Sequence, residues 1–227
     1  MRAKCCEGGA NLKLSTKNRL EHHLVIAIGS IACAALLSAL GYEIQRAIAA
    51  VSYFLLFLVM IIGPSVRIWP SITKQFRGPF PVSWRAELGI WFAIWSVAHV
   101  LFVWGARDWD VTGYLVDMSP WAFGALVAVI IAIVLACTSN TAALKFMGDK
   151  AWKWLHSYGV YVIFWLTAVH VYDRAYLRPY EDVGFPSTDP IHWVYLITLA
   201  LVVLLQLTAF VRIVADYRKT GEYPQGL

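Results

Sequence analysis

Six histidines carry most of the chemistry that this sequence could perform. They are His22, His23, His99, His156, His170 and His192. Three of them, His99, His156 and His170, fall inside long apolar stretches, where an ionisable side chain is rare and usually functional. The simpler alternative is a neutral histidine that hydrogen-bonds to a neighbouring helix. Three histidines at matching depths favour a functional site over that alternative.

Helical geometry predicts that His99 and His170 lie at a similar depth. A helix that starts near Glu87 and rises about 1.5 Å per residue carries His99 roughly 18 Å along it. On a second helix, His170 lies about 21 Å beyond His156 and faces nearly the same way. Two imidazoles at one level on facing helices are the axial pair that haem iron requires. The separation of about 21 Å also excludes His156 and His170 from one metal coordination sphere.

At the depth of His156, the sequence offers no second histidine on the facing helix to complete a pair. The position about 14 residues before His99 is Arg85, which cannot act as an ordinary haem ligand. A guanidinium can instead pair with a propionate or a phosphate as a bidentate donor. Four alternatives stay open here: a haem with an unusual or missing sixth ligand, a flavin, a quinone, or a structural histidine. His22 and His23 either supply the missing ligand or are interfacial residues.

The composition indicates what kind of molecule holds these histidines. Of the 227 residues, 59% are hydrophobic and 15% are charged, and the mean hydropathy is +0.61. A soluble domain has about one quarter charged residues. These values exclude a disordered protein, a basic nucleic-acid-binding domain and an ordinary soluble enzyme. The four cysteines (Cys5, Cys6, Cys33 and Cys137) lack metal-ligand spacing and are expected to be reduced, with palmitoylation of the first two as an alternative.

Six apolar stretches are each long enough to cross a bilayer, which takes about 20 residues. They cover 24–42, 47–66, 88–106, 118–144, 154–172 and 190–211. Spanning segments without barrel alternation must be helical, because lipid offers the backbone no hydrogen-bond partners. The sequence therefore predicts an all-α integral membrane protein, with a six-transmembrane-helix bundle over 24–214 between tails at 1–23 and 215–227. His192, at the start of the last span, is expected to be interfacial.

The distribution of positive charge predicts the orientation of this bundle. If the chain crosses six times, 15 of its 19 Lys and Arg residues fall on the side that holds both tails. The positive-inside rule then makes both termini cytoplasmic. The opposite side carries eight acidic residues and a net negative charge. Its largest segment, 173–190, is the candidate docking surface for a partner with a basic patch.

Several ordered segments resemble the ferric-reductase-like transmembrane domain family. They are 84–89 (Trp-Arg-Ala-Glu-Leu-Gly) with the Ala-His pair at 98–99, 135–139 (Leu-Ala-Cys-Thr-Ser), and 152–161 (Trp-Lys-Trp-Leu-His-Ser-Tyr-Gly-Val-Tyr) with Ala-Val-His at 168–170. The family includes NADPH oxidases, ferric-chelate reductases and bacterial haem subunits. Arg85 stands where the oxidases have a further histidine, so the pattern is closest to the MsrQ-like branch.

The resemblance implies a membrane protein that binds haem b, with one or two haems per chain. His99 and His170 would be axial ligands of one iron, and His156 a ligand of an inner haem iron. Arg85 would bind the cofactor at the inner level, where a flavin or quinone near Arg85 and His156 is the alternative. The implied function is the electron-transfer subunit of an oxidoreductase, located in a bacterial inner membrane and without catalytic residues of its own.

The resemblance also bears on the partners. The oxidases and ferric reductases carry a fused nucleotide-binding part, but this sequence ends soon after its last span and shows no Gly-rich fingerprint. The donor is therefore expected to be a separate cytoplasmic flavoprotein or a quinol. The acceptor is expected to be a protein or small molecule on the outer side, and no nucleic acid is involved.

Interpretations without redox chemistry are weaker but not eliminated by the residues alone. A transporter often shows inverted repeats and broken helices, and neither is visible in this sequence. A scaffold would leave the matched depths of His99 and His170 as coincidence. The second interpretation is therefore a non-catalytic membrane subunit or scaffold of a larger respiratory or photosynthetic assembly.

Overall fold

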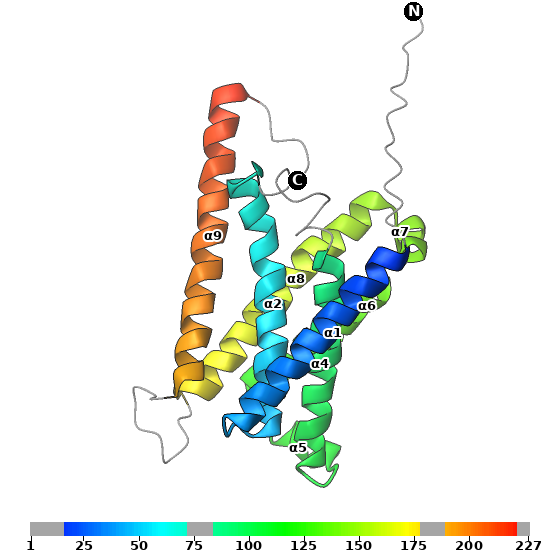
Figure 1. The fold of residues 1–227 in the computed structure, drawn as a ribbon, viewed down its shortest axis with the longest axis vertical. Helices are drawn as coiled ribbons and strands as arrows, with labels where there is room; N and C mark the ends of the chain where they lie inside the picture. The colour runs from blue at the N-terminus through cyan, green and yellow to red at the C-terminus, as the bar shows by residue number, and fades with distance from the viewer. Residues whose placement is uncertain (1–15, 72–83, 178–188, 222–227) are drawn as a thin grey trace, which may run out of the picture.

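A computed structural model describes residues 16–71, 84–177 and 189–221, which form a bundle of helices (Figure 1). The long helices are α1 (Thr16–Ala39), α2 (Ile44–Ile68), α4 (Arg85–Gly105), α6 (Pro120–Thr138), α8 (Asp149–Tyr172) and α9 (Pro190–Thr220). Shorter elements are α5 (Val111–Val116), α7 (Thr141–Met147) and the π-helix η2 (Asp173–Leu177). No strand occurs among the described residues, which confirms the predicted all-α class.

The predicted spans each coincide with one long helix, but the six-span count is not confirmed. Five helices, namely α1, α2, α4, α6 and α9, are long and apolar enough to cross a membrane. The helix α8 is as long as α1, yet its first turns carry Asp149, Lys150 and Lys153. The rest of α8 also contains His156, His170 and several tyrosines, and the helix is not among the candidate membrane spans.

The central helix of the bundle is α2, which packs against α1, α4, α8 and α9. Next to it, α6 packs against both α4 and α8. The long helices alternate in direction. In Figure 1, α1 therefore begins beside α7 on the right and α9 ends at the upper left, both toward the upper end of the bundle, while α5 lies at the bottom. We refer to these as the α7 end and the α5 end of the bundle.

The outward faces of the bundle are apolar. Ile28, Leu204 and Phe210 are each 60% or more exposed, and many other large hydrophobic side chains share this position. Exposed apolar surface on this scale marks contact with a membrane or a partner. The interior holds Leu56 and Phe164, which are almost fully buried. This arrangement fits a bundle whose solvent is lipid.

Local sequence signals explain where the helices begin and how closely they pack. Ser119 and Asp189 cap α6 and α9 with their side chains, and each cap is followed by a proline at the first helical position. Gly159 lets α8 approach α6, because a Cβ there would lie 3.2 Å from Leu135. The Tyr42 hydroxyl donates to the Asp189 carboxylate at 2.8 Å, which joins the α1–α2 turn to the start of α9.

Some predictions fall on residues outside the described part of the chain. They concern the Cys5–Cys6 pair, most of the N-terminal tail, and 178–188 of the predicted docking loop. Cys33 and Cys137 lie within the described residues and are free thiols, as expected.

Candidate functional site

A cavity of about 410 Å³ lies at the α5 end of the bundle, between α2, α4, α6, α8 and the start of α9. This volume is within the range of about 300–1,000 Å³ that is typical of small-molecule and cofactor sites. Side chains from five helices converge on one space here. The cavity is therefore the candidate functional site.

His99 from α4 and His170 from α8 both line this cavity. The Nδ1 atom of each ring is buried and has no hydrogen-bond partner among the described residues. The structure thus brings together the two histidines that helical spacing placed at one level. Their role as metal ligands stays a prediction.

Small side chains create the space between the two histidines. Alanine and serine from α2, α4 and α6 line the cavity, among them Ala49, Ser96, Ala122, Ala125 and Ala128. Ser52 and Ser96 also form a buried hydrogen bond of 2.7 Å that joins α2 to α4. Small residues at a helix interface allow close backbone approach. Here they bring the helices together and leave open space in the cavity.

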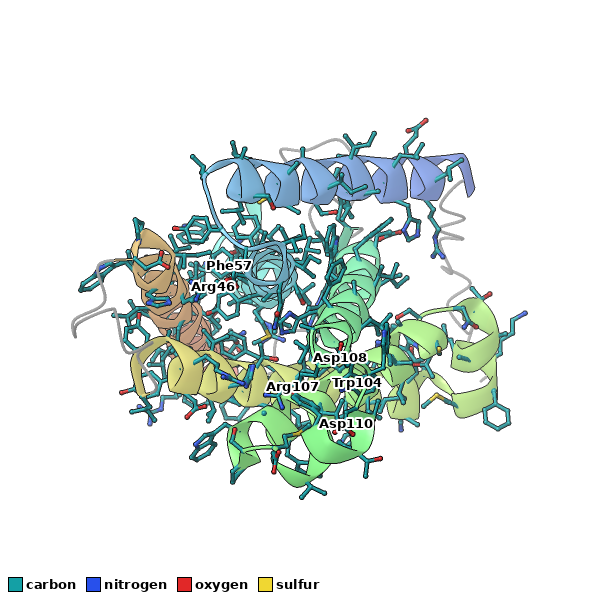
Figure 2. The ribbon with its side chains drawn as sticks, turned by 90° about the horizontal axis from the view of Figure 1, so that it is seen from below. Arg46, Phe57, Trp104, Arg107, Asp108 and Asp110 are labelled. Carbon is teal, nitrogen blue, oxygen red and sulfur yellow. The ribbon has the colours of Figure 1, made fainter. Side chains whose placement is uncertain are left out.

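Three arginines line the cavity at the α5 end, namely Arg46, Arg107 and Arg174. Figure 2 looks onto this end of the bundle and labels Arg46, at the start of α2, and Arg107, just beyond α4. The sequence analysis treated these residues only as charges that report orientation. A sequence signal was present for one of them: Arg174 follows His170 by four residues and so shares its helix face.

The chain folds sharply after Arg107, and this turn fixes the arginine. Asp108 and Trp109 adopt positive φ angles of 51° and 61°, which non-glycine residues rarely do. The Arg107 guanidinium carbon lies 4.8 Å from the centre of the Tyr114 ring, in a cation–π contact. The strained turn and the tyrosine together place a positive charge at the mouth of the cavity.

An aromatic wall completes the cavity on the α9 side. His192 lines the cavity, and its ring centre lies 5.9 Å from that of Tyr176 and 6.4 Å from that of Tyr195. The Tyr53 and Tyr195 rings meet edge to face at 4.9 Å. The sequence analysis expected His192 to be interfacial, and the structure adds that it lines the cavity wall. The signal missed was its position on the first turn of α9, next to Tyr195.

His156 does not line the cavity, and its ring already has a hydrogen-bond partner and a stacking partner. Its Nε2 atom lies 3.0 Å from the Thr138 hydroxyl, and its face stacks on Trp152 with ring centres 4.1 Å apart. The Trp152 indole donates in turn to the Thr138 carbonyl at 2.8 Å. These contacts join α6 to α8 and match the structural alternative for this histidine. The resemblance had implied a haem ligand here.

Arg85 begins α4 at the α7 end of the bundle and also lies outside the cavity. Its guanidinium approaches α2, where a Cβ at Gly63 would lie 3.9 Å from the nearest nitrogen. Its charge also acts on His156, so the two residues predicted to share the inner level are near each other. The described residues contain no carboxylate paired with Arg85 within 4.0 Å. It therefore remains a candidate anion-binding group.

The sequence analysis considered His22 as a further ligand for an inner haem near His156. In the structure, His22 lies beside Glu87. Its Nδ1 atom lies 4.0 Å from a carboxylate oxygen of Glu87, and its ring centre lies 4.8 Å from that of Trp84. Glu87 is 4% exposed. The structure therefore places His22 with a buried acid between α1 and α4, rather than beside His156.

The cavity residues fit a haem group. In the described part of the chain, no three His, Cys, Asp or Glu side chains are grouped so that they could hold a metal ion alone. A haem needs fewer protein ligands, because the porphyrin fills four positions and the protein fills the axial ones. Two half-buried imidazoles, each with a buried Nδ1 atom that has no described partner, line a cavity with aromatic and cationic walls and match that requirement.

Comparison with known proteins agrees with this chemistry. No protein-family profile matches the chain. Over 132 residues, the chain is 24% identical to the protein-methionine-sulfoxide reductase heme-binding subunit MsrQ of Cronobacter sakazakii. The match covers 56% of this chain and 62% of that relative, which is less than two thirds of its length. The chain is thus an all-helical protein with several apolar, membrane-length helices and a similarity to a bacterial haem-binding subunit.

Proposed function

We propose that this chain is a haem b-binding, electron-transfer subunit of a membrane oxidoreductase. The observation that carries the proposal is that His99 and His170, from different helices, line one cavity with buried, unpartnered Nδ1 atoms. Similarity to a haem-binding subunit supports the same chemistry. The proposal places the chain in the MsrQ-like branch of the ferric-reductase-like family.

The residues of the cavity have separate roles in this proposal. His99 on α4 and His170 on α8 would hold the haem iron, and a haem with two histidine ligands would favour electron transfer over oxygen binding. Haem b, when bound, supplies a one-electron redox couple. The alanines and serines leave room for the porphyrin, and the surrounding helices keep water away from it. A drier environment alters the reduction potential of such a centre.

We expect one haem per chain, because Thr138 and Trp152 already hold His156. The test is a reduced-minus-oxidised visible spectrum of the purified protein, with haem quantified per chain. A b-type signal at one haem per chain supports the proposal. His156→Ala should retain that signal and lower stability by about 1–3 kcal/mol through the lost contacts.

Other results would change the assignment. Two haems per chain, with one lost in His156→Ala, would restore the inner haem that the resemblance implied. No haem in protein produced with ample haem supply would contradict the proposed function. A subunit or scaffold without redox chemistry would then be the better interpretation.

The proposed orientation makes α8 a sixth span, within a transmembrane domain at 24–214 and with both termini in the cytoplasm. Alternating helix directions put the start of α1 and the end of α9 at the same end of the bundle, which supports this arrangement (Figure 1). A fluorescent protein fused after Leu227 should therefore fluoresce, and a periplasmic alkaline phosphatase fused there should be inactive. The opposite pattern would reverse the orientation.

The proposed partners follow from the orientation. A cytoplasmic flavoprotein or a quinol would donate electrons at the α7 end, and a protein or small molecule would accept them beyond the α5 end. The location would be a bacterial inner membrane. Arg85 and His156, near the α7 end, remain the residues best placed for a flavin or quinone. Reduction of the purified protein by each donor class would distinguish them.

A further inference from the structure

Two of the three arginines that line the cavity have no carboxylate partner in the described part of the chain. Arg46 lies 3.9 Å from Glu43, so its charge is already partly compensated. Among the described residues, no acidic side chain lies within 4.0 Å of Arg107 or Arg174. Both line the same cavity as His99 and His170. We call Arg107 and Arg174 the arginine pair.

Two acids near this end of the bundle, Asp110 and Asp189, accept hydrogen bonds from other groups. The buried Asp173, next to Arg174 in the chain, does not line the cavity. The Asp110 side chain caps α5 by accepting from the Gly113 N–H at 2.8 Å. The Asp189 side chain accepts from the Tyr42 hydroxyl and from the Ile191 N–H. An anion that reaches the cavity therefore meets two guanidinium groups with no described ion pair to break.

The arginine pair is also well placed relative to the histidines. Arg174 lies one turn beyond His170, and its charge acts on both His170 and His99. Arg107 comes from the opposite side, beyond α4, where the strained turn and Tyr114 hold it. Two cations from different elements thus face one space that also contains two imidazoles.

We propose that Arg107 and Arg174 form a carboxylate clamp that binds the two propionates of the porphyrin at the α5 end of the cavity. The inference rests on the proposed function. It adds the orientation of the haem, whose propionate edge would lie at the α5 end of the cavity. Haem b carries two carboxylates, and a carboxylate buried without a partner is strongly unfavourable. Guanidinium binds carboxylates bidentately, which gives both strength and a fixed orientation.

The clamp has a chemical consequence that does not depend on activity. The wild-type protein should prefer haem over haem dimethyl ester, in which both carboxylates are blocked, by about tenfold or more. The clamp should also raise the reduction potential, because nearby positive charge stabilises the more electron-rich reduced state. The arginine pair would therefore set both which porphyrin binds and how readily it is reduced.

The experiment titrates full-length, haem-free protein in lipid nanodiscs with haem and, separately, with haem dimethyl ester. The double variant Arg107→Gln/Arg174→Gln should lose most of the preference for haem, and its midpoint potential should become more negative. Replacement of both residues by lysine should restore part of the preference, since lysine keeps the charge but not the bidentate geometry. Arg218→Gln, at the far end of α9, is the matched control and should behave as wild type.

The results separate the clamp from the function on which it rests. Wild-type protein that binds both porphyrins equally would overturn the clamp and leave haem binding intact. A double variant that keeps the full preference would also overturn it. Wild-type protein that binds neither porphyrin would contradict the proposed function itself.

Discussion

His99→Ala and His170→Ala are each expected to abolish the low-spin b-type spectrum. Each variant removes one of the two imidazoles that α4 and α8 bring to the cavity. The third histidine of the cavity wall, His192, has its ring against Tyr176 and Tyr195, so we do not expect it to replace the lost ligand. Mutation of a residue that only hydrogen-bonds to a metal ligand usually lowers metal affinity by about 10- to 100-fold. Loss of an axial ligand should cost more. The measurement is the reduced spectrum and the haem content of purified protein.

Chemical rescue distinguishes a lost ligand from a damaged fold. His99→Gly and His170→Gly leave a space the size of the removed ring, and added imidazole should restore a low-spin spectrum in both. The control is His23→Ala, which changes a histidine on α1 outside the cavity and should keep the haem. Retention of the full low-spin spectrum in either alanine variant would show that the axial pair is wrong.

Helical spacing alone was sufficient to place the two key histidines. Hydropathy located each long helix, because a lipid-facing segment must be apolar along its whole length. The regular rise per residue then set the depth of His99 and His170, and the structure brings both to one cavity. What the spacing could not show was the state of each ring. For His156 the sequence left a haem ligand and a structural histidine as alternatives, and the structure shows that Thr138 and Trp152 contact its ring.

The features that sequence reasoning missed depend on tertiary packing. Arg107 reaches the cavity because the chain turns sharply at Asp108 and Trp109. No residue pattern in the sequence predicts this turn. His192 joins the wall because α9 starts beside η2, where Tyr176 donates to its carbonyl. The sixth span, α8, is not confirmed for a simpler reason. This helix is long enough, but the histidines, tyrosines and other polar residues along it lower its hydropathy.

Filling the cavity should abolish haem binding even when both histidines are present. Ala125 lies on α6 and lines the cavity, so the ring in Ala125→Phe would occupy space that the porphyrin needs. We expect complete loss of the b-type spectrum. Overpacking a dense core costs about 1–3 kcal/mol, but here the ring enters an open space and the cost should be smaller. Helical content and solubility in detergent should therefore remain as in wild type.

Ala136→Phe is the matched control for this substitution. Ala136 is also half-buried on α6, 11 residues further along and on nearly the same face of the helix, but it does not line the cavity. This variant should keep its haem. Added imidazole should not rescue Ala125→Phe, because no ligand is missing, whereas it should rescue His99→Gly. A normal haem content in Ala125→Phe would show that the porphyrin binds outside this cavity. The proposal that His99 and His170 bind haem within the cavity would then be wrong.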